Sequence, residues 1–307
     1  MKRLNITNFN FWDMVEYLLA NMTAVEAAKA VKKRKIVVLP VGAIHKHGDG
    51  PLGTAMFSCT ELARRLGEAI PNKVIVLPTL PYGVSSGAVL PGGIDTSFEP
   101  VRQMIKDISM SFVKHGTKHF LYLTGHGGND NAYLSVASEL HKYGVLCAYV
   151  RWWDLIIQLK GDVELNYRNV NILEQSVMAA VGVTKDISVL KDGETRLGAF
   201  QKRLRDEILG DKFGVPDKMK GTLICAGSDP TITRVRHGVV YKKGTIQIPL
   251  PRAQVDLNNP EPGEWPSIAN KVSAKQGNDI LNTCRDWLVE FLADFEALEI
   301  PEKYWKK

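Results

Sequence analysis

The first half of the chain alternates between apolar runs and helical patterns. The runs KIVVLPVGAI, KVIVLPTL, HFLYLT and VLCAYV are almost wholly apolar, which is typical of strands buried on both faces. Helical segments lie between them, and one of these opens with a capping box of Thr23 and Glu26. This order predicts an α/β fold with a doubly wound, mostly parallel sheet sandwiched by helices.

Residues 185–265 interrupt that alternation. They contain a basic amphipathic segment, short β-like runs and several prolines. A chain of 307 residues can bury one large core, so we interpret the stretch as an insertion or lid within a single domain spanning residues 1–307. A helical pattern that begins near Ser273 closes the chain.

Charge and composition exclude several classes of protein. The net charge is +6, but the basic residues are spread out and no nucleic-acid-reading motif accompanies them, so no nucleic-acid partner is expected. No apolar stretch is long enough to span a membrane, and the N-terminus has no signal-like apolar core. The four cysteines show no CxxC spacing. We expect a cytoplasmic protein with no membrane partner.

Side chains that can bind a metal follow two of the apolar runs. His45, His47 and Asp49 follow the first run, in VLPVGAIHKHGDGPLGT, and His126 follows the third, in TGHGGNDN. In a parallel sheet both loops open at the same edge, so these groups can converge. Imidazole nitrogens and carboxylates suit Zn²⁺, and also Mn²⁺ or Fe²⁺. The pattern predicts a divalent-metal site at the carboxyl edge of the sheet.

Each of these residues also has a purely structural explanation. A lone histidine in a loop is more often hydrogen-bonded to its surroundings than bound to a metal, and His126 could simply cap the helix that follows. The sequence GHGGND could cradle an anion at a helix N-terminus, although it lacks the GxGxxG spacing. The convergence of two loops is what favours a metal.

Three blocks of the sequence resemble one known family. LPVGAIHKHGDGPLGTA, LPTLPYGVSSGAVLPGG and YLTGHGGNDNAYL are similar, in order and spacing, to motifs of the creatininase (creatinine amidohydrolase) family. The resemblance implies that family's α/β sandwich, a homo-oligomer with a hexamer favoured, and a metal-dependent hydrolase acting on a small-molecule substrate. Family members open cyclic amides such as creatinine, cleave formamide groups, and in some branches open keto-inositol rings.

The resemblance also assigns metal ligands. His45, His47 and His126 match metal-binding positions, and Glu174 matches the last metal-binding glutamate, its alternative being a solvated helix residue. Ala55 stands where the family has an aspartate that bridges two metals. Because alanine cannot ligate, we expect one divalent ion per chain, Zn²⁺ in the first place and Mn²⁺ or Fe²⁺ as alternatives.

Catalytic and substrate-binding roles complete the expected site. A carboxylate that is not a ligand can act as general base, and the GHGG backbone can donate to an oxyanion. Of the adjacent Trp152 and Trp153, one should face the pocket and one the core, since neighbours at a strand end point to opposite sides. The expected catalytic residues are Asp49, His126 and Glu174, and the expected substrate-binding residues are Gly127, Gly128, Asn129 and Trp152.

Two classes of function remain open from the sequence. The first is a metal-dependent hydrolase that uses metal-activated water to open a small cyclic polar ring, either a cyclic amide (lactam) or a cyclic polyol ketone such as a keto-inositol. Ser86 and Gly87 replace a Glu-His pair of the family, which argues against creatinine itself. The second is a metal-poor, catalytically degenerate binding or regulatory member, which the alanine at position 55 supports.

Overall fold

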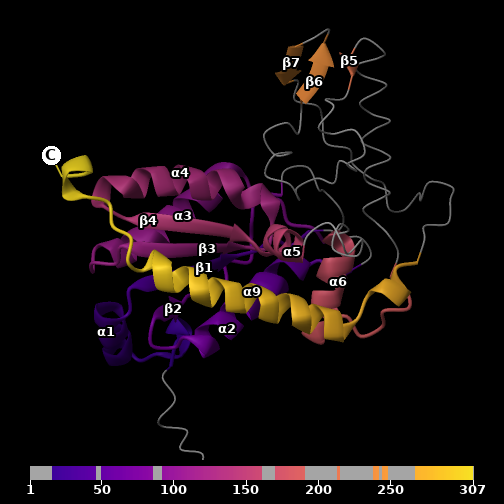
Figure 1. Cartoon of the computed structure of the whole chain (residues 1–307), viewed down its shortest axis with the longest axis horizontal. Helices are drawn as coiled ribbons and strands as arrows, with labels where there is room; N and C mark the ends of the chain where they lie inside the picture. The colour runs from indigo at the N-terminus through magenta and orange to yellow at the C-terminus, as the bar shows by residue number, and fades with distance from the viewer. Residues whose placement is uncertain are drawn as a thin grey trace, which may run out of the picture.

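The computed structural model describes residues 16–45, 50–85, 92–160, 170–190 and 267–306, and the backbone of three short strands between residues 213 and 247. Figure 1 shows a central sheet with helices on both of its faces. The strands of this sheet are β1 (Ile36–Val41), β2 (Val74–Val76), β3 (His119–Thr124) and β4 (Leu146–Arg151).

All neighbouring strands of this sheet run parallel, in the order β2-β1-β3-β4. The chain therefore goes from β1 to β2 on one side and then places β3 on the other side of β1. Such a reversal is a topological switch point, and open α/β sheets bind ligands there, beyond the carboxyl ends of the strands. The predicted doubly wound parallel sheet is confirmed.

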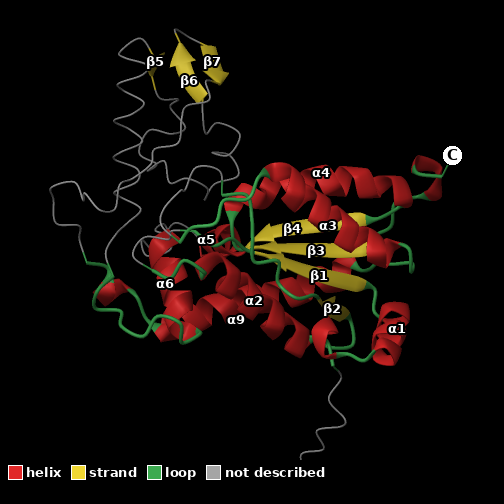
Figure 2. Cartoon of the chain, turned by 180° about the vertical axis from the view of Figure 1, so that it is seen from behind, coloured by secondary structure: helices red, strands yellow, loops and turns green. Residues whose placement is uncertain are grey.

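Each central strand contributes to two hydrophobic cores. In β1, Ile36 and Val38 belong to one core, whereas Val37 and Leu39 belong to the other, as the two-residue period of a strand requires. One face of the sheet is covered by α2, α5, α6 and α9, and the other by α1, α3 and α4 (Figure 2). The helices are α1 (Ala24–Lys33), α2 (Thr54–Ala69), α3 (Phe98–Val113), α4 (Asp130–Leu140), α5 (Trp152–Lys160), α6 (Val170–Ala180) and α9 (Ala274–Phe295).

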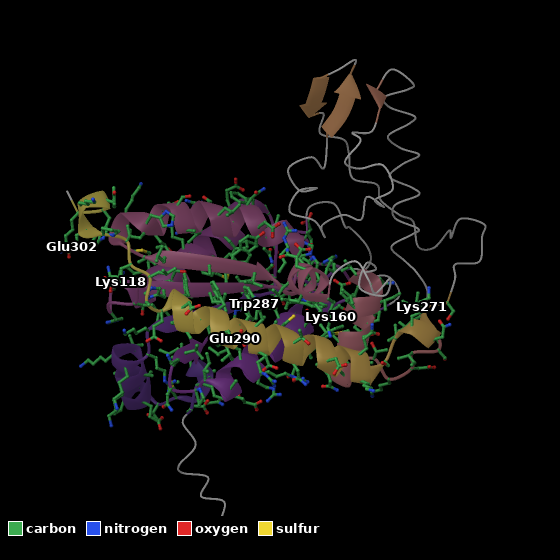
Figure 3. All side chains as sticks on the ribbon, viewed as in Figure 1. Lys118, Lys160, Lys271, Trp287, Glu290 and Glu302 are labelled. Atoms are coloured by element: carbon green, nitrogen blue, oxygen red, sulfur yellow. The ribbon has the colours of Figure 1, made fainter. Side chains whose placement is uncertain are left out.

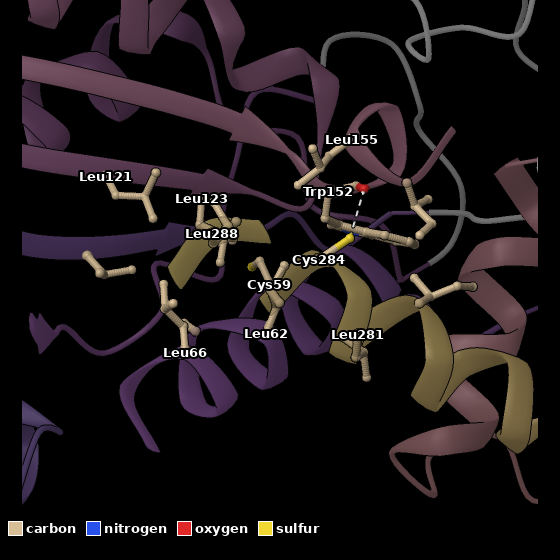
Figure 4. Close-up of a cluster of buried hydrophobic side chains, with 14 of the residues drawn as sticks. Cys59, Leu62, Leu66, Leu121, Leu123, Trp152, Leu155, Leu281, Cys284 and Leu288 are labelled. Atoms are coloured by element: carbon tan, nitrogen blue, oxygen red, sulfur yellow. Dashed lines mark hydrogen bonds between the residues drawn. The ribbon is translucent and has the colours of Figure 1, made fainter. Parts of the chain in front are cut away.

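Helix α9 packs into the core that contains Ile36 and Val38, which we call the first core. Its inward side carries Leu281 and Leu288, which are buried with Leu62 of α2 (Figure 4). Its outward side carries Trp287 and Glu290, which are exposed (Figure 3). This amphipathic pattern explains why a helix distant in sequence covers the sheet.

The capping box predicted at the start of α1 is present. Thr23 accepts a hydrogen bond from the backbone N–H of Glu26 at 3.3 Å, and the Glu26 carboxylate accepts one from the backbone N–H of Thr23 at 2.8 Å. Two backbone donors that the helix leaves without partners are thereby satisfied.

Within the predicted insertion, three strands have a described backbone. They are β5 (Phe213–Gly214), β6 (Gly238–Tyr241) and β7 (Gly244–Gln247), and they form a separate antiparallel sheet in the order β5-β6-β7. The parallel alternation of the first half therefore stops here, as expected. The proposed lid role concerns residues outside the described part of the chain.

Among the described helices, none combines the length and the apolar character that crossing a membrane requires.

Candidate metal and active site

The sheet brings together the first loop, which follows β1, and the third loop, which follows β3. β1 and β3 are neighbours, and their last residues, Val41 and Thr124, are paired in the sheet. His45 lies just beyond β1 and His126 just beyond β3, and their ring centroids are 4.2 Å apart at an interplanar angle of 63°. The expected convergence of the two loops is observed for this pair of histidines.

Hydrogen bonds to their backbone groups hold both histidines in place. The N–H of His45 donates to the carbonyl of Leu52 at 3.0 Å, which closes the base of the first loop. The hydroxyl of Thr124 accepts from the N–H of His126 at 3.1 Å and donates to its carbonyl at 2.8 Å. The two imidazoles therefore project from fixed points of the backbone.

The ring of His126 has a defined partner. Its Nε2 lies 2.9 Å from the carbonyl oxygen of Val84. A carbonyl oxygen can only accept, so this nitrogen carries the hydrogen and donates it.

Glycines in the third loop permit close backbone approach. A Cβ at Gly128 would lie 1.9 Å from the carbonyl oxygen of Val84, and a Cβ at Gly125 would lie 1.7 Å from the carbonyl oxygen of Ala55. No larger residue fits at either position without movement of the backbone. Gly127 and Gly128 begin the short 3-10 turn Gly127–Asn129 that leads into α4. Their predicted contact with substrate stays a prediction.

The side chain of Asn129 is hydrogen-bonded to the backbone inside the protein. Its side chain is fully buried; Oδ1 accepts from the N–H of Val84 at 2.9 Å, and Nδ2 donates to the carbonyl of Gly42 at 3.1 Å. The prediction that Asn129 binds substrate is not supported by this geometry, because the amide is engaged with the backbone of two other segments.

Trp152 is a core residue. It begins α5 instead of ending β4, so the alternation expected of a strand end does not apply. Its exposed fraction is 1%, and its indole Nε1 donates to the hydroxyl of Ser58 at 3.1 Å. Trp153 is buried as well and meets Trp152 edge to face. The geometry gives Trp152 a packing role in place of the predicted substrate contact.

Glu174 is buried in α6. Its exposed fraction is 5%, and burial raises the pKa of its carboxyl to about 8. The alternative interpretation as a solvated helix residue is therefore wrong. The first loop lies against the same helix, because a Cβ at Gly50 would come within 2.0 Å of the Gln175 amide. Buried carboxyls with raised pKa values are common at functional sites.

Of the predicted metal ligands, the structure brings His45 and His126 into contact. No group of three or more His, Cys, Asp or Glu side chains suited to a metal occurs among the described residues, so Glu174 is not brought to His45 and His126 as a third ligand. His47 and Asp49 lie outside the described residues. Two adjacent imidazoles from separate loops fit a divalent ion such as Zn²⁺ or Mn²⁺.

A buried ion triad borders the site and was not predicted from the sequence. Arg151, at the end of β4, donates from Nη1 to Asp154 Oδ2 at 2.9 Å and from Nη2 to Asp130 Oδ2 at 2.5 Å. All three residues are more than nine-tenths buried. The i, i+3 spacing of Arg151 and Asp154 was a visible sign of this pair. The carboxylate of Asp130, which follows the GHGGN stretch, is thus engaged in this triad.

Comparisons with known proteins agree on one family. A family model described as creatininase, creatinine amidohydrolase, matches residues 20–182, just over half of the chain. No curated protein matches the sequence.

Several solved structures share the fold. One described as creatininase Mn has a TM-score of 0.60 at 18% identity and covers 92% of this chain and 100% of its own. A Zn-Zn type mutant creatininase has a TM-score of 0.59 at 18% identity, with coverage of 92% and 99%. A putative creatinine amidohydrolase from Bacteroides fragilis has a TM-score of 0.57 at 19% identity, with coverage of 94% and 99%. The chain belongs to the creatininase (creatinine amidohydrolase) family of metal-dependent amidohydrolases.

Proposed function

We propose that the chain opens a small cyclic amide by hydrolysis at the sheet edge between β1 and β3, with one divalent ion per chain. The observation that carries this proposal is the contact of His45 with His126 at the topological switch point. Two half-buried imidazoles from separate strand ends suit the binding of one ion, and family membership supplies the class of reaction.

His45 and His126 would hold the ion, and His47 and Asp49 are the further candidates from the first loop. We propose Zn²⁺, because imidazole-rich sites favour it, and Mn²⁺ is the alternative suggested by the solved relatives. When bound, such an ion supplies an activated water and polarises the substrate carbonyl.

We propose Glu174 as the proton donor, because its helix lies against the first loop, where a Cβ at Gly50 would come within 2.0 Å of the Gln175 amide. Because burial raises the carboxyl pKa of Glu174 to about 8, it can hold a proton at neutral pH and donate it to the nitrogen that leaves the ring, and the carboxylate so formed can take up the proton that the attacking water loses. The backbone N–H groups at the start of the turn that opens with Gly127 and Gly128 are suited to stabilise the oxyanion, since the first N–H groups of a helical turn lack intrahelical acceptors.

The test of this function combines metal content with ring opening. The purified, zinc-loaded protein is incubated with five- and six-membered cyclic amides and with a cyclic polyol ketone, and the addition of one water is followed by mass spectrometry. His126→Ala should abolish turnover, whereas His141→Ala, which changes an exposed histidine at the far end of α4, should not. Turnover that survives His126→Ala would contradict the proposal.

A second candidate function is a metal-poor binding or regulatory member of the family. It is favoured by Ala55, which is 1% exposed and offers no ligand in the first turn of α2. Protein purified without added metal that contains no divalent ion, and that binds none from micromolar Zn²⁺, would support this candidate over the hydrolase.

We also propose an assembly and a location for the protein. A homo-oligomer, with a hexamer favoured, is suggested by the family resemblance, and a cytoplasmic location by the cysteine pattern. Small molecules are the proposed partners, with no nucleic acid or membrane among them. Light scattering of the purified protein tests the assembly; a species of one chain's mass would contradict it.

A further inference from the structure

The backbone of Val84 connects Asn129 to His126. The N–H of Val84 donates to Asn129 Oδ1, and the carbonyl of the same residue accepts from His126 Nε2, each at 2.9 Å. Asn129 Nδ2 also donates to the carbonyl of Gly42, at the end of β1, at 3.1 Å. One buried amide therefore links the first loop, the Val84 segment and the third loop.

The orientation of the Asn129 amide is fixed by its partners. A backbone N–H can only donate and a backbone carbonyl can only accept, so Oδ1 must face Val84 and Nδ2 must face Gly42. Asn129 is fully buried, and so water does not compete for these bonds. Aspartate has the same shape but cannot donate to Gly42.

Two glycines make room for this arrangement. A Cβ at Gly83 would lie 2.3 Å from the Gly42 carbonyl oxygen and 2.5 Å from Asn129 Oδ1. A Cβ at Gly128 would lie 1.9 Å from the Val84 carbonyl oxygen and 2.5 Å from His126 Nε2. Any side chain at Gly128 would thus occupy the place of the hydrogen bond between Val84 and His126.

We infer that Asn129 is a positioning residue that, through Val84, sets the tautomer of His126 so that Nδ1 is its metal-binding nitrogen. A neutral imidazole carries one hydrogen, and the Val84 carbonyl holds it on Nε2. A histidine ligand commonly donates its other N–H to a carbonyl, which orients the ring and raises the basicity of the ligating nitrogen. The inference rests on the proposed metal site for its purpose, but the tautomer itself does not require a metal.

The first experiment reads the tautomer directly. The full-length protein is labelled with ¹⁵N-histidine, stripped of metal, and examined by nitrogen NMR of the imidazole rings. The signals of His126 among the seven histidines are those lost in His126→Gln. Hydrogen on Nε2 is expected. Hydrogen on Nδ1 would overturn the inference, whether or not the protein later proves to bind zinc.

The second experiment tests the role of Asn129 with the zinc ion alone. Zinc affinity is measured by competition with a fluorescent chelator for the wild type, Asn129→Asp and the control Asn131→Asp, which changes the exposed residue two positions along. Asn129→Asp should weaken zinc binding by about 10- to 100-fold and mix the tautomers of His126, and the control should do neither. If Asn129→Asp lowers the stability of the protein but leaves the His126 tautomer and the zinc affinity unchanged, Asn129 is only structural and the inference is overturned.

Gly128→Ala provides an independent variant. Its Cβ would crowd both the Val84 carbonyl and His126 Nε2 and would leave the Asn129 amide unchanged, so it should produce the same loss of zinc affinity and the same mixture of His126 tautomers. An unchanged tautomer in folded Gly128→Ala would count against the inference. If the wild type shows the Nε2–H tautomer but binds no zinc, the proposed function fails while the tautomer assignment stands.

Discussion

His45 and His126 belong to different loops, yet their rings meet edge to face with centroids 4.2 Å apart. The contact depends on the pairing of β1 with β3, because the loops leave the sheet from Val41 and Thr124, which are register partners. An ion held by both rings would make their contributions to binding interdependent.

We predict that zinc binding depends on the pair as a unit. His45→Gln and His126→Gln should each weaken zinc affinity at least about 100-fold, and the double variant should be only slightly weaker than either single one, because the remaining ring cannot hold the ion alone. Chelator competition on all four proteins measures this. Additive losses would show that the two rings do not share an ion.

A second prediction concerns Arg151. Its removal takes the Arg151 guanidinium away from the buried carboxylates of Asp130 and Asp154, both of which it contacts. Arg151→Met should therefore lower the free energy of unfolding by about 3–5 kcal/mol, as measured by urea denaturation. The control is Arg285→Met, since Arg285 pairs with the exposed Asp286; its loss should stay below about 1 kcal/mol. Similar losses of unfolding free energy in both variants would show that the buried triad does not stabilise the fold more than an exposed ion pair does.

The sheet could be predicted from the sequence because each strand is marked by the residues of its own segment. Continuous apolar runs mark strands buried on both faces, and their alternation with helices marks a parallel sheet. The resemblance to known motifs added the family. The strand order β2-β1-β3-β4 was not available from either, since it depends on which strands pair.

The site was predicted less completely because its details come from long-range contacts. The amide of Asn129 pairs with Gly42 and Val84, which are distant in sequence. Trp152 was expected at a strand end, but the helix begins at that residue and turns the ring toward Ser58. The burial of Glu174 arises where α6 packs into the first core. None of these contacts can be predicted from the residues next to it in the sequence.

A third prediction follows from the raised pKa of Glu174. Burial raises the pKa of this carboxyl to about 8 in the folded protein, from an ordinary value of 4.5. Between these values folding must take up a proton, so stability falls as the pH rises from about 4.5 to about 8. Glu174→Gln removes that dependence. In metal-free protein, the melting temperature of Glu174→Gln relative to wild type should therefore rise by several degrees from pH 5.5 to pH 8.

The control for this prediction is Glu290→Gln, which changes an exposed carboxylate on α9. Its difference from wild type should stay the same at both pH values. If Glu174→Gln behaves in the same way as this control, the carboxyl of Glu174 is not held in its protonated form by burial.

The last prediction concerns the number of metal ions. Ala55 is buried in the first turn of α2, and its carbonyl oxygen lies against Gly125, one residue before His126. Two divalent ions a few ångströms apart repel strongly unless an anionic group lies between them. With alanine at this position we expect one tightly held ion per chain. Ala55→Asp introduces a carboxylate near the His45–His126 pair, and also at a helix N-terminus, where negative charge is favourable.

We therefore expect elemental analysis to give one zinc per chain for the wild type and close to two for Ala55→Asp. Ala55→Asn is the matched control, because it adds the same volume without the charge and should remain at one. The alternative is that Asp49 already supplies the missing carboxylate from the first loop. Two ions per chain in the natural protein, falling to one in Asp49→Ala, would contradict the one-metal prediction and identify Asp49 as the bridging ligand.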